Sequence, residues 1–136
     1  MDVIEHIADA GKFLANIKEK FPNLKNIIIT VPARQEIFSN YDEFNNHFLR
    51  YDFKTLESHC TPLMFKKIEM SYFFHSLYLP AWFLKKSAKK RNTTIEPPKG
   101  FAKVLHQFLS ACFFMEYKIL PSRLIGTSII ADVTLK

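Results

Sequence analysis

The stretch NIIITVP at residues 26–32 decides the fold class of this chain. Its β-branched run predicts a strand, and the closing proline marks where that strand ends. Because the run is apolar without alternation, we expect a strand that is buried on both faces. Such strands are typical of parallel sheets whose two faces are covered by helices.

A helix is predicted directly before this strand, over residues 9–21. Asp9 is its expected N-cap, and Pro22 and Asn23 end it. Apolar residues recur at helical spacing on one face: Phe13, Leu14, Ile17 and Phe21. A helix followed by a buried strand is half of a βαβ unit, so the sequence indicates an α/β fold.

The rest of the chain alternates between polar segments and further elements. Residues 32–60 are polar, aromatic and irregular, with a short helix expected over 54–60. Residues 66–74 alternate as a second strand, and residues 77–100 form a basic, proline-containing excursion. A helix from Phe101 to about Tyr117 and a terminal strand over 126–135 complete the order.

Composition bounds the class of protein. The chain has 136 residues, is 48% hydrophobic and carries a formal net charge of +6, which suits one domain over residues 1–136. Cys60 and Cys112 show no spacing typical of a metal site, so we expect reduced thiols, no metal and a cytoplasmic location. No apolar run approaches the roughly 20 residues that span a bilayer, and no secretory signal is visible.

Several ordered motifs carry a family resemblance. DVIEHIAD (2–9) before a helix, NIIITVPA (26–33), SNYD (39–42) and NHFLRYDFKTL (46–56) resemble the C-terminal half of class I S-adenosylmethionine-dependent methyltransferases of the small-molecule type. In that family the pattern runs D-V-L-E-H, a helix, a strand ending V-P-A, S-x-x-D and G-H-x-R-R-Y. The resemblance covers nearly the whole chain, and motifs in a fixed order are more specific than any one of them.

The later segments continue the resemblance. EMSYFFHSLYLP is similar to the family's sixth strand and the excursion after it, and FLSACFFMEYKILPSRLIGTSIIADVTLK is similar to the last helix and the antiparallel seventh strand. The resemblance therefore implies a Rossmann-like methyltransferase sheet of which the chain holds the C-terminal half only. That half comprises strands five to seven with flanking helices, the last strand being antiparallel.

The resemblance also implies that the cofactor-binding half is missing. Met1 would fall inside the fourth strand, and the three glycines of the chain form no G-x-G-x-G turn. We expect a single partial methyltransferase domain that supplies the acceptor side of the enzyme and is inactive alone. Its expected partners are a small-molecule acceptor and either a second copy or the missing N-terminal half, because an open sheet edge favours association.

Two groups of site residues follow from the resemblance. It places S-adenosylmethionine beside Asp2 and Glu5, and it gives proton-exchanging catalytic roles to His6 and His47. For Asp2, Glu5 and His6 the alternative is a polar N-terminal turn that caps the helix.

Asp42, Arg50 and Tyr51 match family positions that line the acceptor pocket. The alternative is a salt-bridged, packed start of a helix, which we favour for Arg50 and Tyr51. Asn46 stands where the family has glycine and Leu49 where it has the first arginine, so recognition of the acceptor departs from the family pattern.

Aromatic and basic residues are mixed in residues 71–92. The favoured interpretation is a lid helix with an exposed basic linker. A membrane-surface patch that suits a lipophilic acceptor is the second, and nucleic-acid contact is the least favoured. His75 and His106 lie among apolar residues and are expected to be packed or hydrogen-bonded rather than metal-binding. A competing hypothesis for the whole chain is a non-catalytic module that associates through its exposed sheet edge.

Overall fold

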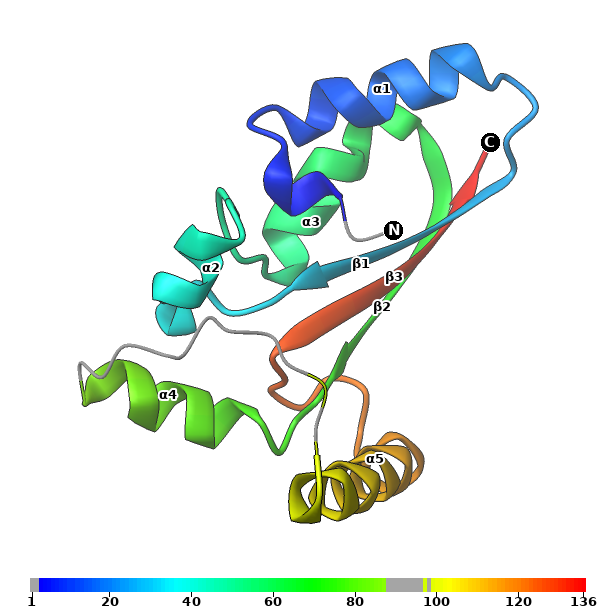
Figure 1. Cartoon of the computed structure of the whole chain (residues 1–136). Helices are drawn as coiled ribbons and strands as arrows, with labels where there is room; N and C mark the ends of the chain where they lie inside the picture. The colour runs from blue at the N-terminus through cyan, green and yellow to red at the C-terminus, as the bar shows by residue number, and fades with distance from the viewer. Residues whose placement is uncertain (1–2, 88–96, 98) are drawn as a thin grey trace.

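The computed structural model describes residues 3–87, 97 and 99–136. Along the chain the described elements are η1 (Ile4–His6), α1 (Ala10–Lys20), β1 (Asn26–Pro32), η2 (Gln35–Ile37), α2 (Asn40–Phe44), α3 (Phe53–Cys60), η3 (Thr61–Leu63), β2 (Phe65–Phe73), α4 (Tyr78–Lys86), α5 (Phe101–Ile119) and β3 (Ser128–Leu135). The fold is mixed α/β, as the sequence predicts (Figure 1). Part of the basic excursion, residues 88–96 and 98, lies outside the described range, as do Met1 and Asp2.

The sheet is a small open one with the strand order β1-β3-β2. The C-terminal strand β3 lies in the centre and pairs antiparallel with both neighbours, so that Ala131 faces Ile29 on one side and Met70 on the other. The parallel sheet that the apolar run favours is therefore wrong for these strands, whereas the expected antiparallel last strand is confirmed. β1 and β2 do run in the same direction, but β3 separates them, and the only parallel pairing in the described residues is an isolated bridge between Ala33 and Tyr51.

Only one face of the sheet is buried. In β1, Ile27, Ile29 and Val31 are buried while Ile28 is 58% exposed. Helices α1 and α3 lie together on one side of the strands (Figure 1). Helices α4 and α5 lie near the end of the sheet at which β1 and β2 finish. The prediction of burial on both faces is therefore wrong for the described residues. An uninterrupted apolar run allows a strand to be covered on both faces, but it does not show that a second covering layer is present.

A single core lies between this covered face and the helices. It is built from β-branched and small side chains of the strands together with apolar residues of η1, α1, α3 and η3. The fully buried large side chains with apolar bodies are Ile4, Leu14, Ile29, Tyr51, Leu56, Leu63 and Ile129. Each such side chain stabilises the fold by about 1.5–3 kcal/mol relative to exposure.

Side-chain caps fix where the helices begin. Asp9 accepts a hydrogen bond from the Lys12 amide at 2.9 Å, which confirms the predicted N-cap of α1. Asp52 caps α3 in the same way, accepting from the Thr55 amide at 2.7 Å, so that helix begins one residue before the predicted start. The segment between β1 and α3 is less irregular than expected, because it contains η2 and α2.

Helix α5 is long, apolar and largely exposed. It ends at Ile119 rather than near Tyr117, and its end residues Phe101 and Ile119 are 83% and 68% exposed. His106 lies on this helix and is exposed, so the expectation that it is packed is wrong. His75 is buried and its Nδ1 lies 2.9 Å from the carbonyl oxygen of Ile125, as a packed histidine requires. Among the described helices, none combines the length and the apolar run needed to cross a membrane.

Candidate functional site

A capping box holds Asp42 at the start of α2. Ser39 is the N-cap, and its backbone amide donates to Oδ2 of Asp42 at 2.9 Å. The Ser39 hydroxyl also lies 3.3 Å from the same oxygen. The S-x-x-D motif is thus a helix start by local chemistry, because serine and an acidic residue three positions later satisfy each other's backbone amides. The result is a fully buried carboxylate whose Oδ1 points away from the helix start.

Two cationic or polar side chains meet at Oδ1 of Asp42. Arg50 Nε donates to it at 2.9 Å, and His47 Nδ1 lies 3.0 Å away. Burial by itself would raise the pKa of Asp42, but the charge of Arg50 and the hydrogen bonds from His47 and Ser39 outweigh it and hold that pKa below its usual value. Asp42 is therefore an anion at neutral pH and fixes the orientation of His47.

Arg50 is held in place by several contacts within the protein. Besides Asp42, its Nη1 donates to the carbonyl oxygen of Ala33 at 3.1 Å, and its backbone amide donates to Oε1 of Gln35 at 2.7 Å. Its side chain is only 9% exposed. These contacts agree with the salt-bridged alternative and tie the loop after α2 to the end of β1.

Asn46 has a backbone conformation that is typical of glycine. Its φ of 56° lies in the left-handed region, which glycine adopts freely and asparagine tolerates better than most residues. Asn46 therefore allows a tight turn directly before His47, whose Nδ1 lies 3.0 Å from Oδ1 of Asp42.

The N-terminal motif meets this cluster from the other side. Glu5 and His6 belong to η1, whose position is fixed because the Phe48 amide donates to the Glu5 carbonyl at 2.8 Å. The His6 and His47 rings contact edge to face, with centroids 4.8 Å apart. Glu5 is almost fully buried and its Oε1 lies 4.0 Å from His6 Nε2, while the His6 side chain is 41% exposed. The structure thus brings Glu5, His6, Asp42 and His47 together.

Tyr51 lies beneath the cluster, inside the core. Its hydroxyl donates to the Ile4 carbonyl at 3.3 Å and the ring is fully buried. Burial, with smaller effects from the charges of Glu5 and Cys60, raises the pKa of Tyr51 to about 12. Its backbone also exchanges hydrogen bonds with Pro32 and Arg34. Tyr51 supports the site from below, which agrees with the structural alternative for this residue.

A cavity of about 610 Å³ opens beside His47 and Arg50. Its polar lining comes from α2, from the segment that follows α2 and from the start of β3 with the residue before it. Much of its apolar lining comes from the segment leading into α4 and from α4 itself. The lining residues on the α4 side are Leu77, Pro80, Ala81 and Leu84. A volume of this size suits a small organic molecule, and α4 covers one side of it, as the predicted lid does.

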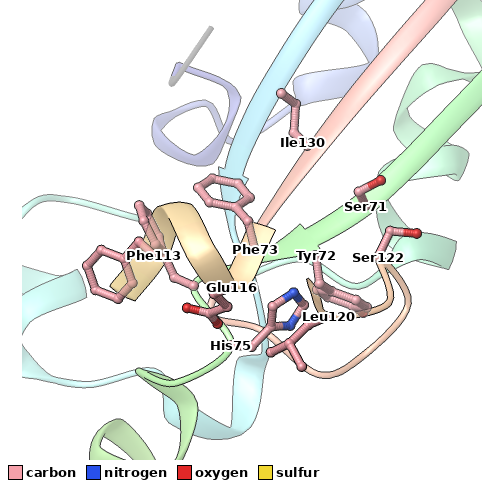
Figure 2. Close-up of a pocket in the computed structure, with 10 residues that line it drawn as sticks. Ser71, Tyr72, Phe73, His75, Phe113, Glu116, Leu120, Ser122 and Ile130 are labelled. Carbon is pink, nitrogen blue, oxygen red and sulfur yellow. The ribbon is translucent and has the colours of Figure 1, made fainter. Parts of the chain in front are cut away.

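A second pocket, of about 280 Å³, lies between α5 and the uncovered face of the sheet (Figure 2). Figure 2 shows Glu116 and Phe113 of α5 near His75, with Phe73 and Ile130 on the strands. The Glu116 carboxylate accepts from the Ser76 amide at 2.8 Å and lies 3.1 Å from the Ser76 hydroxyl. Sequence reasoning missed this pocket. The signal for it was one acidic residue within an otherwise apolar helix face.

A scan against protein-family models, a search of curated proteins and a search of solved structures each return no match for this chain. The geometry therefore carries the functional argument. Glu5, His6, Asp42, His47 and Arg50 converge at the end of β1, whereas Asp2 lies outside the described residues.

Proposed function

We propose that this chain forms the acceptor side of a Rossmann-like S-adenosylmethionine-dependent methyltransferase and transfers no methyl group by itself. The observation that carries the proposal is the cavity beside His47. Its lining combines polar side chains, among them His47 and Arg50, with apolar residues that include those on the α4 side. A small acceptor with one polar group and an apolar body fits such a lining.

The arrangement of the strands supports the same proposal. The family resemblance implies a last strand that runs antiparallel to its neighbours, and β3 runs antiparallel between two strands of common direction. The cavity lies at the end of β1, where loops of open α/β sheets gather around ligands. Helices α1 and α3 cover one face of the sheet (Figure 1). In the proposed complete enzyme a further layer would cover the other face.

The chemistry asks for alignment and, for an un-ionised acceptor, a base. The sulfonium donor is already activated, so holding the nucleophile, the methyl group and the leaving sulfur in line supplies much of the rate. His47 is the base we propose, because Asp42 holds its Nδ1 and leaves Nε2 to take a proton from an acceptor hydroxyl or amine. Arg50 acts through Asp42 rather than by touching the acceptor.

A lipophilic acceptor is favoured by the surface of α4. Leu79 and Phe83 are each 61% exposed on this helix, and Lys85 and Lys86 follow them. Exposed apolar side chains beside cations suit the headgroup region of an anionic membrane, where such an acceptor would be found. We therefore include peripheral membrane contact by α4 in the proposal.

The test compares the isolated chain with a completed one. In titration calorimetry with S-adenosylhomocysteine, we expect no saturable heat from the isolated chain. Fusion behind the donor half of a small-molecule methyltransferase, strands one to four, should give a folded protein that binds it. Saturable binding by the isolated chain overturns the proposed division of labour, and a chimera that folds without binding overturns the methyltransferase proposal.

A non-catalytic interaction module is the second candidate. It is favoured by the apolar surface that the described residues leave exposed, on α5 and on the open sheet face around Ile28 and Ile130. Light scattering across a concentration series tests it, with Ile130→Lys as the variant. Association that the lysine abolishes, together with a chimera that fails to bind S-adenosylhomocysteine, would favour the module over the enzyme.

A further inference from the structure

We infer that Glu5, His6 and His47 form a binding site for a divalent transition metal, of which Zn²⁺ is the best match. One potential ligand atom from each residue lies within 4.8 Å of the others. Among the described residues, this is the cluster of three histidine, cysteine or acidic side chains that is close enough to hold one metal ion. The sequence spacing predicts no metal site, because the ligands come from two segments about 40 residues apart. The inference goes beyond methyl transfer and stands without it.

The ligand set matches zinc chemistry. Two imidazoles and one carboxylate are a ligand set of catalytic zinc sites, which keep a fourth position for water or substrate. Imidazole nitrogens favour transition metals, whereas Mg²⁺ prefers oxygen ligands. Two histidines among three ligands therefore point away from magnesium.

Asp42 gives His47 the support that a metal-binding histidine needs. Its Oδ1 lies 3.0 Å from His47 Nδ1, which fixes a proton on that nitrogen and leaves the lone pair on Nε2. A carboxylate behind a ligating histidine orients the ring and raises its basicity. Asp42 is itself held by Arg50 and by the Ser39 amide, so the support is rigid.

Burial and exposure are distributed as an open metal site requires. Glu5 is 3% exposed, so its carboxylate would reach a metal from inside the protein. The His6 side chain is 41% exposed, which leaves solvent access on its side.

The distances require only a small closure. Ligand atoms of a tetrahedral zinc site with bonds of roughly 2.0–2.1 Å lie about 3.3 Å apart. Rotation of the His6 ring, whose side chain is 41% exposed, can supply the adjustment, although it changes the edge-to-face contact with His47. His47 also lines the large cavity, so a metal held here would lie beside that cavity.

The experiment is zinc titration of the untagged, chelator-treated chain, by calorimetry and thermal unfolding. We expect one Zn²⁺ per chain and a raised Tm. His6→Ala and His47→Ala should each weaken binding by at least about 100-fold, and Asp42→Asn by about 10–100-fold. If Asp42→Asn fails to fold by circular dichroism, His6→Ala still decides, since its side chain is exposed.

Three controls separate this site from adventitious binding. His106→Ala removes an exposed histidine on α5, and Cys112→Ser removes a partly exposed thiol. Both should bind zinc as the wild-type chain does. Burial raises the pKa of the Cys60 thiol to about 11, so Cys60 needs no variant. Excess Mg²⁺ should not compete.

The results that overturn the inference are specific. The first is that the folded chain binds no zinc, and the second is that neither His6→Ala nor His47→Ala weakens binding. The third is that a control variant loses binding, and the fourth is that excess Mg²⁺ displaces the zinc. None of these readouts involves S-adenosylmethionine, so either proposal can fail without the other. His47 Nε2 has one lone pair, so it serves as the proposed base only while no metal is bound to it.

Discussion

The Nε atom of Arg50 lies 2.9 Å from Oδ1 of Asp42, and the carboxylate is completely buried. A buried ion pair of this kind contributes little when it replaces apolar packing, but removing one partner leaves a charge without compensation. Arg50→Met should therefore lower the free energy of unfolding by about 3–5 kcal/mol. Urea unfolding at pH 7 measures this.

Arg123 offers a matched control, because it is a second arginine on an exposed turn. Arg123→Met should change the free energy of unfolding by no more than about 0.5 kcal/mol. In the double variant Asp42→Asn, Arg50→Met, the loss should be smaller than the sum of the single losses. Additive losses would show that the two side chains do not interact.

The lowered pKa of Asp42 predicts a loss of stability in acid. In the folded state burial raises this pKa, but Arg50, His47 and Ser39 more than offset it. The stabilisation is therefore complete above the unfolded value, about 3.9, and disappears as the pH falls through the folded pKa. The free energy of unfolding, measured from pH 6 downward, should fall less steeply with decreasing pH for Asp42→Asn than for the wild type. Equal slopes would contradict the assignment.

Tyr51 predicts a loss of stability at high pH. Its folded pKa is raised to about 12, first by burial and then by the charges of Glu5 and Cys60. The folded state therefore keeps its proton where the unfolded state loses it, and stability falls between about pH 10 and the folded value. Tyr51→Phe should lower the free energy of unfolding by about 1 kcal/mol at pH 7, because it removes the hydrogen bond to the Ile4 carbonyl. The stability of this variant should then fall less steeply than that of the wild type as the pH rises above about 10. A decline as steep as that of the wild type would show that other groups cause it.

The two faces of β3 predict opposite outcomes for neighbouring isoleucines. Ile129 is fully buried on the covered face, whereas Ile130 is 40% exposed on the open one. Ile129→Ala should lower the free energy of unfolding by about 2–5 kcal/mol, because it leaves a cavity. Ile130→Ala should cost less than about 1 kcal/mol. Similar losses in denaturant unfolding would place a further layer on the open face.

Gly126 and Gly11 predict opposite effects of one methyl group. A Cβ at Gly126 would lie 2.5 Å from the Phe73 carbonyl oxygen, so backbone must move, while at Gly11 the nearest atoms are 3.8 Å away. Gly126→Ala should cost about 1–3 kcal/mol. Gly11→Ala should gain up to about 1 kcal/mol through helix propensity. Thermal unfolding of both variants checks the signs.

Local signals predicted the elements well. Asp9 and the spacing of Leu14 and Ile17 placed α1, and alternation placed β2 and β3 within one or two residues. These features depend on neighbours in the chain, so a single sequence contains them. Helix α2 was missed because its five residues are too few to show helical periodicity, although the residues of its capping box are visible in the sequence.

The sequence by itself determined the α/β class, the start of α1 and the side chains available to a site. Only the tertiary structure decided the strand order, the single covered face and the meeting of Glu5 and His6 with Asp42 and His47. The physical reason is distance along the chain. Caps and periodicity are set by contacts a few residues apart, whereas strand β3 and the site assemble through contacts between remote segments, which no local pattern encodes.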